Sequence, residues 1–203
     1  MNDRPNNQVD LDQAMMQATM DIAAAGDWAS CRLVDIAAAA GLTPGALPAR
    51  YRNKTDVLRA LADRLDAEVL AAVDGNPDDP DIPVRERLLE VLMQRFDAMA
   101  PCKAGITGVL RAISLSPSTM RHGVPALARS MKVTLDMANI PSGGISGTFR
   151  AKGLAVVFLD GLRVWIGDDS PDLSATMRRL DERLKQAERI AVSLGLAQPA
   201  KPL

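Results

Sequence analysis

Positively charged side chains gather in one segment of the N-terminal third of the chain. Residues 32–59 contain five cations against the two acids Asp35 and Asp56, a net charge of +3, in a chain whose formal net charge is −1. The five cations are Arg32, Arg50, Arg52, Lys54 and Arg59. Because contacts to nucleic-acid phosphates require local positive charge, this segment is the candidate DNA-facing surface of the N-terminal region. A solvated helix face is the alternative interpretation.

The residues that could support catalysis or bind a metal lack the partners that such chemistry requires. The single histidine, His122, has no Cys or Ser nucleophile at a recognisable spacing. Cys31 and Cys102 lack further Cys or His ligands for zinc, and two cysteines do not form a disulfide framework. The acidic pair at 168–169 precedes a Ser-Pro step and is interpreted as a helix-entry pair. We therefore expect no enzymatic activity, no cofactor and no metal site.

The elements that carry these side chains are expected to be helices. Of the 203 residues, 47% are hydrophobic and 24% charged, which is typical of a compact soluble protein. Ten Met against only 3 Phe, 2 Trp and 1 Tyr favour helix over strand, so the predicted fold class is all-α. No uncharged run reaches the ~18–20 residues of a membrane span, and the polar N-terminus lacks a signal-peptide pattern. We expect a cytoplasmic protein with no membrane span.

Short helices joined by tight turns are predicted for the first seventy residues. Apolar spacing indicates helices over 11–25 and 33–40, and Gly41 follows the second as a helix stop. Thr-Pro at 43–44 is an N-cap followed by a first-turn proline, so a third helix is expected to begin at Pro44. A capping box at 53–56 predicts a fourth helix to about residue 73. Helices two and three would form a helix-turn-helix.

The helix-turn-helix segment resembles the DNA-binding region of the tetracycline-repressor (TetR) family. The resemblance lies in VDIAAAAGLTPGAL at 34–47 and YRNKTDVL at 51–58. It implies an α-helical homodimer whose N-terminal helix-turn-helix reads the major groove of an operator, and whose larger C-terminal part binds a small ligand and dimerises. The DNA-binding residues expected on this basis are Arg32, Thr43, Pro44, Gly45, Ala46, Leu47, Arg50, Tyr51 and Lys54.

One residue of the expected recognition helix departs from the family pattern. Pro48 stands where the family usually carries an aromatic residue, and a proline inside a helix removes a backbone hydrogen bond and can kink it. The expected base-facing residues Thr43, Ala46 and Leu47 are small or apolar, whereas direct readout normally uses Arg, Asn or Gln. The pattern therefore indicates the fold more strongly than it indicates specific DNA reading, and a helix-turn-helix retained as a scaffold is the alternative.

The C-terminal part is predicted to be helical after an acid- and proline-rich linker. The expected domains are 1–73, the helix-turn-helix with its connector helix, and 83–203, the ligand-binding and dimerisation domain, joined by the linker 74–82. Two long amphipathic helices near the C-terminus suit a two-fold interface, although both could simply cover one monomer's core. The expected interface residues are Leu154, Phe158, Leu162, Trp165, Leu173, Met177, Leu180 and Leu184.

Methionines and aromatic residues after position 90 could line an adaptable apolar pocket, or could be ordinary core filling. The expected ligand-binding residues are Met93, Phe96, Met99, Leu110, Met120, Met131, Leu135 and Phe158. A ligand held by these side chains would be small and largely apolar. The first functional hypothesis is therefore a TetR-type regulator, a repressor that such a ligand releases from DNA.

A second resemblance supplies the alternative hypothesis. The C-terminal third is similar to a coenzyme-Q biosynthesis accessory family with a TetR-like fold, through FRAK at 149–152 and the residues Leu154, Asp168, Ser170, Asp172, Thr176 and Leu180. That resemblance implies binding of lipid or isoprenoid molecules without DNA binding. Pro48 favours this reading.

Overall fold

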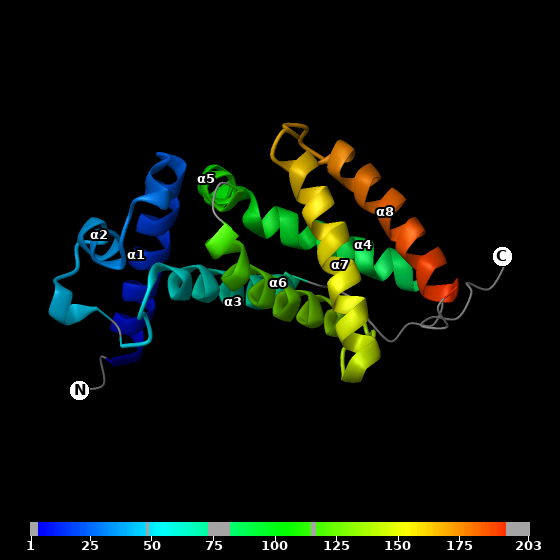
Figure 1. Ribbon diagram of the computed structural model, residues 1–203, viewed down its shortest axis with the longest axis horizontal. Helices are drawn as coiled ribbons and strands as arrows, with labels where there is room; N and C mark the ends of the chain where they lie inside the picture. Colours follow the sequence, from blue (N-terminus) through cyan, green and yellow to red (C-terminus); the bar gives the residue numbers. More distant parts are fainter. Residues whose placement is uncertain (1–3, 48, 73–81, 115–116, 194–203) are drawn as a thin grey trace. The chain divides into compact units, whose positions relative to one another are not determined.

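The computed structural model describes residues 4–47, 49–72, 82–114 and 117–193, and these ranges contain helices and turns but no strand. The predicted all-α fold class is confirmed (Figure 1). The linker expected at 74–82 lies almost wholly outside the described residues. No helix in the described ranges is long and apolar enough to cross a bilayer. The α-helices are α1 (Arg4–Ala24), α2 (Leu33–Ala39), α3 (Lys54–Ala72), α4 (Val84–Met99), α5 (Lys103–Ser114), α6 (Pro117–Met137), α7 (Gly144–Trp165) and α8 (Ser174–Ser193), and the 3-10 turns are η1 (Asp27–Ala29), η2 (Pro44–Ala46) and η3 (Ala100–Cys102).

The chain forms two compact units whose boundaries differ from those expected. One unit contains residues 1–64 and 100–124, and the other contains residues 65–99 and 125–203. Helix α5 therefore belongs with the N-terminal helices, because it packs along α1 and η1. Two glycines of α5 permit this close approach: a Cβ at Gly105 or Gly108 would collide with the backbone of α1 at Met20 and Ala23.

Aromatic and leucine side chains form the core of the C-terminal unit. Helix α8 packs against α7 and α4. The ring of Phe96 on α4 stacks on that of Phe158 at a centroid distance of 5.3 Å and lies 5.6 Å from the ring of Trp165. Leu180 and Leu184 of α8 are buried in the same unit. The apolar faces of α7 and α8 thus form part of the core of the monomer.

A buried polar cluster lies among the helices of the same unit. The Arg95 side chain, 3% exposed, donates from Nη1 to Ser130 Oγ and from Nη2 to Thr134 Oγ1, each at 2.9 Å. Its Nη1 also lies 2.6 Å from Asp66 Oδ1, and Ser130 Oγ donates to the same carboxylate oxygen at 2.8 Å. A charge this deeply buried is tolerated only because it is paired and hydrogen-bonded, so the cluster fixes α3, α4 and α6 at this level of the core.

Several helix boundaries differ from the sequence-based expectation, and the first is that of α1, which begins at Arg4 rather than at residue 11. The Gly-Val-Pro sequence at 123–125 predicts a break, because a proline inside a helix removes a backbone hydrogen bond, but α6 continues through Pro125 without one. The final helix was expected to start at the Ser-Pro step of 170–171, but α8 begins at Ser174 after Leu173, whose φ is +48°. The reason lies at Asp168, which is buried: its Oδ2 accepts hydrogen bonds from the Thr176 N–H (2.8 Å) and Thr176 Oγ1 (2.7 Å). The hydrogen bonds that Ser170 donates to Oδ1, its hydroxyl above all, and then those of Thr176 keep the pKa of the Asp168 carboxyl far below its usual range.

Candidate functional site

The first half of the predicted helix-turn-helix is confirmed. Helix α2 ends at Ala39, and Gly41 takes a left-handed φ of +72°. The N–H of Gly41 donates to the Ala38 carbonyl at 3.0 Å, and that of Leu42 to the Ala37 carbonyl at 2.9 Å, which satisfies the last carbonyls of the helix. The chain therefore turns sharply after α2, as the Gly-Leu pair predicts.

The second half is much shorter than expected. The predicted recognition helix is reduced to η2, a single 3-10 turn of three residues that begins at Pro44. It stops because Leu47 is extended, with φ −63° and ψ 124°. A residue before proline is driven out of the helical region by the proline ring, and Pro48 follows Leu47 in the sequence. The expectation of a full third helix from Pro44 is therefore wrong.

The side chains presented by this turn are small. Thr43, Gly45 and Ala46 are exposed, and Leu47 is half-buried. None of these four can form the bidentate hydrogen bonds by which Arg, Asn or Gln recognise a base edge. A surface of this kind can approach DNA closely, but its affinity must come from neighbouring cations and from groove shape.

Lys54 has an internal role that the sequence did not reveal. Its Nζ donates to the carbonyl oxygens of Trp28 at 2.6 Å, Cys31 at 2.9 Å and Ala29 at 3.3 Å. The ammonium also lies 4.7 Å from the centroid of the buried Trp28 ring. Lys54 thus ties the start of α3 to the turn that precedes α2, whereas the sequence predicted a phosphate contact. Its partners are more than twenty residues away, so no local pattern could have identified them.

Three further cations of the segment 32–59 are paired with nearby acids. Arg32 pairs with Asp35 at 3.1 Å, and this hydrogen bonding lowers the pKa of Asp35. Arg59 pairs with Asp56 at 3.3 Å, and Arg50 forms an ion pair with Asp12. These pairs are partly or largely exposed, so each is worth little in water and its cation is accessible to a phosphate.

Tyr51 and Arg52, neighbours in the chain, lie in opposite environments. Tyr51 is 3% exposed and donates from its hydroxyl to Asp12 Oδ1 at 2.8 Å, so it holds α1 against the segment before α3. Arg52 is exposed, and its guanidinium forms no ion pair within the described part of the chain. The sequence places Arg52 in the basic segment 32–59, but the expected set of DNA-binding residues does not include it.

The expected ligand-binding residues are mostly core residues of the C-terminal unit. Phe96, Met99, Met131, Leu135 and Phe158 are buried, and Met93 is half-buried. Leu110 lies on α5 in the other unit, and the side chain of Met120 is outside the described residues. The structure therefore buries five of these side chains within the C-terminal unit, while their role in binding a ligand stays a prediction.

The expected interface residues are placed in a similar way. Six of them are buried within the monomer: Leu154, Phe158, Leu162, Trp165, Leu180 and Leu184. Leu173 is half-buried and Met177 is 41% exposed. The outward face of α7 instead carries other apolar side chains, which lie off the more densely apolar stripe of this helix.

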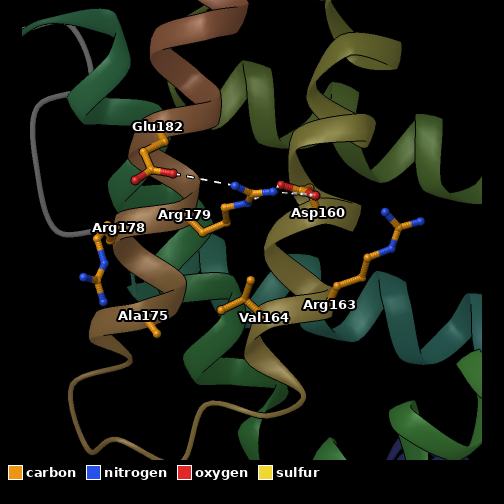
Figure 2. A pocket seen from close by; sticks show the side chains of 7 residues that line it. All are labelled: Asp160, Arg163, Val164, Ala175, Arg178, Arg179 and Glu182. Carbon is orange, nitrogen blue, oxygen red and sulfur yellow. Dashed lines mark hydrogen bonds and ion pairs between the residues drawn. The ribbon is translucent and has the colours of Figure 1, made fainter.

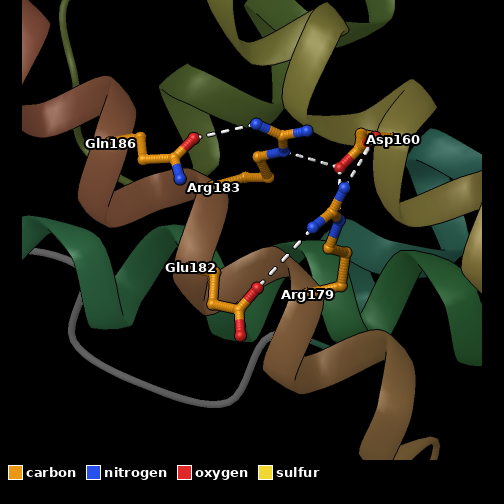
Figure 3. Close-up of polar contacts among 5 residues, drawn as sticks. All are labelled: Asp160, Arg179, Glu182, Arg183 and Gln186. Atoms are coloured by element: carbon orange, nitrogen blue, oxygen red, sulfur yellow. Dashed lines mark hydrogen bonds and ion pairs between the residues drawn. The ribbon is translucent and has the colours of Figure 1, made fainter.

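A shallow hollow lies between α7 and α8, and Figure 2 shows Val164 and Ala175 between Arg163 and Arg178. Its volume is about 400 Å³, and Asp160, Arg179 and Glu182 complete the lining. Oδ2 of Asp160 accepts hydrogen bonds from Nε of Arg179 at 2.6 Å and of Arg183 at 2.7 Å (Figure 3). These guanidinium groups, Arg183 above all, lower the pKa of the Asp160 carboxyl. The hollow is therefore bordered by Arg163, Arg178 and Arg179, and of these Arg179 is held in place by Asp160.

Comparison with known proteins identifies the architecture through solved structures. No family model matches the chain, and no curated protein sequence matches it. A TetR transcriptional regulator from Nitrosomonas europaea superposes with a TM-score of 0.63 at 20% identity, covering 87% of this chain and 97% of that one. A protein from Syntrophomonas wolfei described as a TetR-family transcriptional regulator superposes with a TM-score of 0.58 at 13% identity, covering 91% and 96%. This chain has the fold of the TetR-family transcriptional regulators.

Proposed function

We propose that this protein is a TetR-type DNA-binding transcriptional regulator, a homodimeric repressor whose hold on its operator is weakened by a small apolar ligand. The observation that carries the proposal is the turn from α2 through Gly41 to η2. This turn exposes small side chains, and exposed arginines follow it in the chain. The two regulators described above share the fold and supply its precedent.

Phosphate contacts rather than base contacts are expected to dominate this interface. Arg52 is exposed and unpaired within the described residues, and Arg32 and Arg50 are held only by partly exposed acids. Lys54 is not available in the same way, because three carbonyl oxygens already surround its ammonium. We therefore expect moderate sequence preference and strong dependence of affinity on salt.

Binding of the purified protein to the DNA upstream of its own gene, against scrambled DNA at two salt concentrations, tests the proposal. A specific complex should survive near-physiological salt while non-specific binding is lost. Arg52→Ala should weaken the complex and reduce the slope of log K against log salt by about 0.9 for one lost phosphate contact. Arg189→Ala, which removes an exposed cation of α8, is the matched control and should bind as the parent does.

Equal affinity for both DNAs, or none, would argue against an operator at that site. The alternative, a lipid- or isoprenoid-binding accessory protein that does not bind DNA, has one favourable observation, the loss of most of the recognition helix. Mass spectrometry of the lipids that copurify with the protein separates the two outcomes. Bound isoprenoid without DNA binding would favour the accessory role, whereas a ligand that lowers operator affinity would establish the regulator.

A further inference from the structure

The buried guanidinium of Arg95 has hydrogen-bond donors that its neighbours in the core do not use. Nη1 contacts Asp66 Oδ1 and Ser130 Oγ, and Nη2 donates a single hydrogen bond, to Thr134 Oγ1. Nε is buried and has no hydrogen-bond partner within the described residues. Because Nε and Nη2 form one edge of the planar guanidinium, that edge can still bind an acceptor with two oxygens, such as a carboxylate.

The hydroxyl groups around Arg95 are oriented to support an anion. Thr134 Oγ1 donates its own proton to the Ser130 carbonyl at 3.1 Å, so towards the guanidinium it can only accept. Ser130 Oγ donates to Asp66 Oδ1 at 2.8 Å. A second carboxylate in the place of Asp66 would therefore receive the Ser130 proton as well as the guanidinium.

The charge of this polar cluster, formed by Asp66, Arg95, Ser130 and Thr134, favours a monoanion. The cluster contains one cation and one anion, so exchange of Asp66 for another carboxylate keeps it neutral. A phosphate dianion would leave a surplus charge in the core, which is costly.

Asp66 is the member of the ion pair that can be displaced. Its side chain is 12% exposed, whereas that of Arg95 is 4% exposed. A displaced Asp66 carboxylate can turn outward and regain hydration, but the guanidinium is enclosed and must keep a counter-charge. An incoming acid would therefore compete with Asp66 for Arg95.

An apolar cluster lies next to the polar one along the same helices. On α3, Val69 follows Asp66 by three residues, so both lie on one face of the helix. On α4, Val91 precedes Arg95 by four residues, which again places the two side chains one turn apart. The buried members of this apolar cluster are Val69, Val91, Met137 and Ala138. Partly buried residues pack against it and extend it towards the surface: Leu88, Ala98, Val133 and Ile140.

We propose that this protein binds an amphipathic monocarboxylate, whose acid group replaces Asp66 on the Arg95 guanidinium and whose apolar body lies against the apolar cluster. The inference rests on the proposed function, because it assigns the chemical class of the ligand that the regulator would sense. A purely apolar molecule would leave Nε of Arg95 without an acceptor, whereas a carboxylate supplies one. Met137 has an unbranched, flexible side chain, so it can rearrange to admit the apolar body.

Isothermal titration calorimetry of the full chain with octanoate and phenylacetate tests the ligand class. Each acid is compared with the neutral alcohol of similar shape, octanol or phenylethanol. At least one acid should bind roughly tenfold or more tightly than its alcohol, because only the acid forms charge-assisted hydrogen bonds with Arg95. Equal affinities of acid and alcohol would overturn the proposal, since the apolar body alone would then account for binding.

The variant Asp66→Asn tests the competition. Its amide oxygen still accepts a hydrogen bond from Ser130, but the charge that competes for Arg95 is gone, so acid affinity should rise roughly tenfold. A purely structural role for Asp66 predicts no gain, because the variant would only be less stable. Asp136→Asn, at an exposed residue of α6, is the matched control and should bind as the parent does. Unchanged or weaker acid binding by Asp66→Asn would overturn the proposal.

The variant Arg95→Lys tests the guanidinium itself. A lysine keeps the positive charge but lacks the planar fork, so acid affinity should fall at least about tenfold. Circular dichroism checks that the variant is folded, and if it is not, the Asp66→Asn result decides alone. Arg163→Lys, at an exposed residue of α7, is the control for the same exchange. Undiminished acid binding by folded Arg95→Lys would refute the role of Arg95.

Calorimetry requires no DNA, so the two proposals can fail separately. Acid binding without any operator binding would support this inference and argue against the regulator. Operator binding by a chain that binds neither acid, as the parent or as Asp66→Asn, would overturn this inference and leave the regulator standing.

Discussion

Charged side chains are used differently in the two units of this protein. In the N-terminal unit, Arg32 and Arg59 pair with acids one turn away at the surface, with side-chain exposures of 75% and 49%. In the C-terminal unit, Arg95 and Asp168 are almost fully buried and are surrounded by hydroxyl and backbone partners. The exposed charged side chains are accessible to a ligand such as a phosphate, whereas the buried ones are required for the stability of the fold.

The strongest expected effect is at the buried arginine. Asp66→Ala should lower the free energy of unfolding by roughly 3–5 kcal/mol, because it leaves the Arg95 guanidinium buried without its counter-charge. Urea unfolding followed by helical circular dichroism measures the loss. Glu90→Ala, at an exposed site on α4, is the control and should cost little. Equal stability of the two variants would contradict a structural role for the cluster.

The second-largest loss in the free energy of unfolding is expected for Asp168→Ala. The substitution deletes an acceptor for the Thr176 N–H and hydroxyl, and we expect a loss of about 2–3 kcal/mol by the same measurement. Asp169→Ala, one residue on at an exposed position, is the comparison. Asp168→Asn should lie between them, since its amide oxygen can still accept the two hydrogen bonds of Thr176 while its amide nitrogen cannot accept those of Ser170.

The stabilising effect of Asp168 should depend on pH in a defined direction. Its pKa is lower in the folded protein than in the unfolded chain, where an aspartate titrates near about 3.9. The unfolded state therefore binds protons first, so the contribution is complete above about pH 5 and is lost as the pH falls below about 4. The stability difference between the parent and Asp168→Asn, measured from pH 7 to pH 3, should shrink over the acidic end. A constant difference would show that the carboxylate charge is unimportant.

Lys54 provides an intermediate case, since it is a partly buried cation in the N-terminal unit. Lys54→Met keeps the aliphatic stem but leaves carbonyl oxygens of Trp28 and Cys31 without their donor, and we expect a loss of roughly 1–2 kcal/mol. Thermal unfolding of the variant measures this loss of stability, and Arg52→Met, a substitution at an exposed residue, is the control. A variant as stable as the parent with impaired DNA binding would return Lys54 to the phosphate-contacting role predicted from sequence.

The smallest effect on stability is expected at the surface pair. Asp35→Asn retains an oxygen that accepts a hydrogen bond from the Arg32 N–H. It removes the negative charge that competes with a DNA phosphate for the Arg32 guanidinium. The melting temperature should change little, whereas affinity for DNA at low salt should rise and its salt dependence should steepen. Reduced affinity would show that the pair positions Arg32 for DNA rather than competing with it.

Local patterns predicted the helices well and the fates of individual side chains poorly. The stop at Gly41 and the start of the connector helix at Lys54 depend on neighbours within a few residues, and both are confirmed. The predicted recognition helix does not form, because the restriction that a proline imposes on the preceding residue, Leu47, outweighs the helix-starting effect of Pro44.

Site residues depend on contacts that sequence spacing does not show. The position of Lys54 at a helix start predicts a phosphate contact, but its ammonium group donates hydrogen bonds to carbonyl oxygens of η1 and of the residues that follow η1. On α7, the most apolar stripe of side chains predicts an interface, but the structure buries that stripe in the monomer core. Phe149 and Val156, on another face of the helix, remain exposed. A helix with two apolar faces can be assigned only when the packing of its neighbours is known.

The discontinuity of the N-terminal unit has a consequence for biosynthesis. Because α5 supplies the surface on which Met20 and Ala23 lie, the helices that precede it are incomplete when they leave the ribosome. The 35 residues 65–99 must be synthesised before the segment that contains α5, their closing partner, is made. A nascent chain of this kind exposes an unfinished apolar face during synthesis, which is when chaperones bind. A fragment cut at residue 73 would keep that face bare permanently.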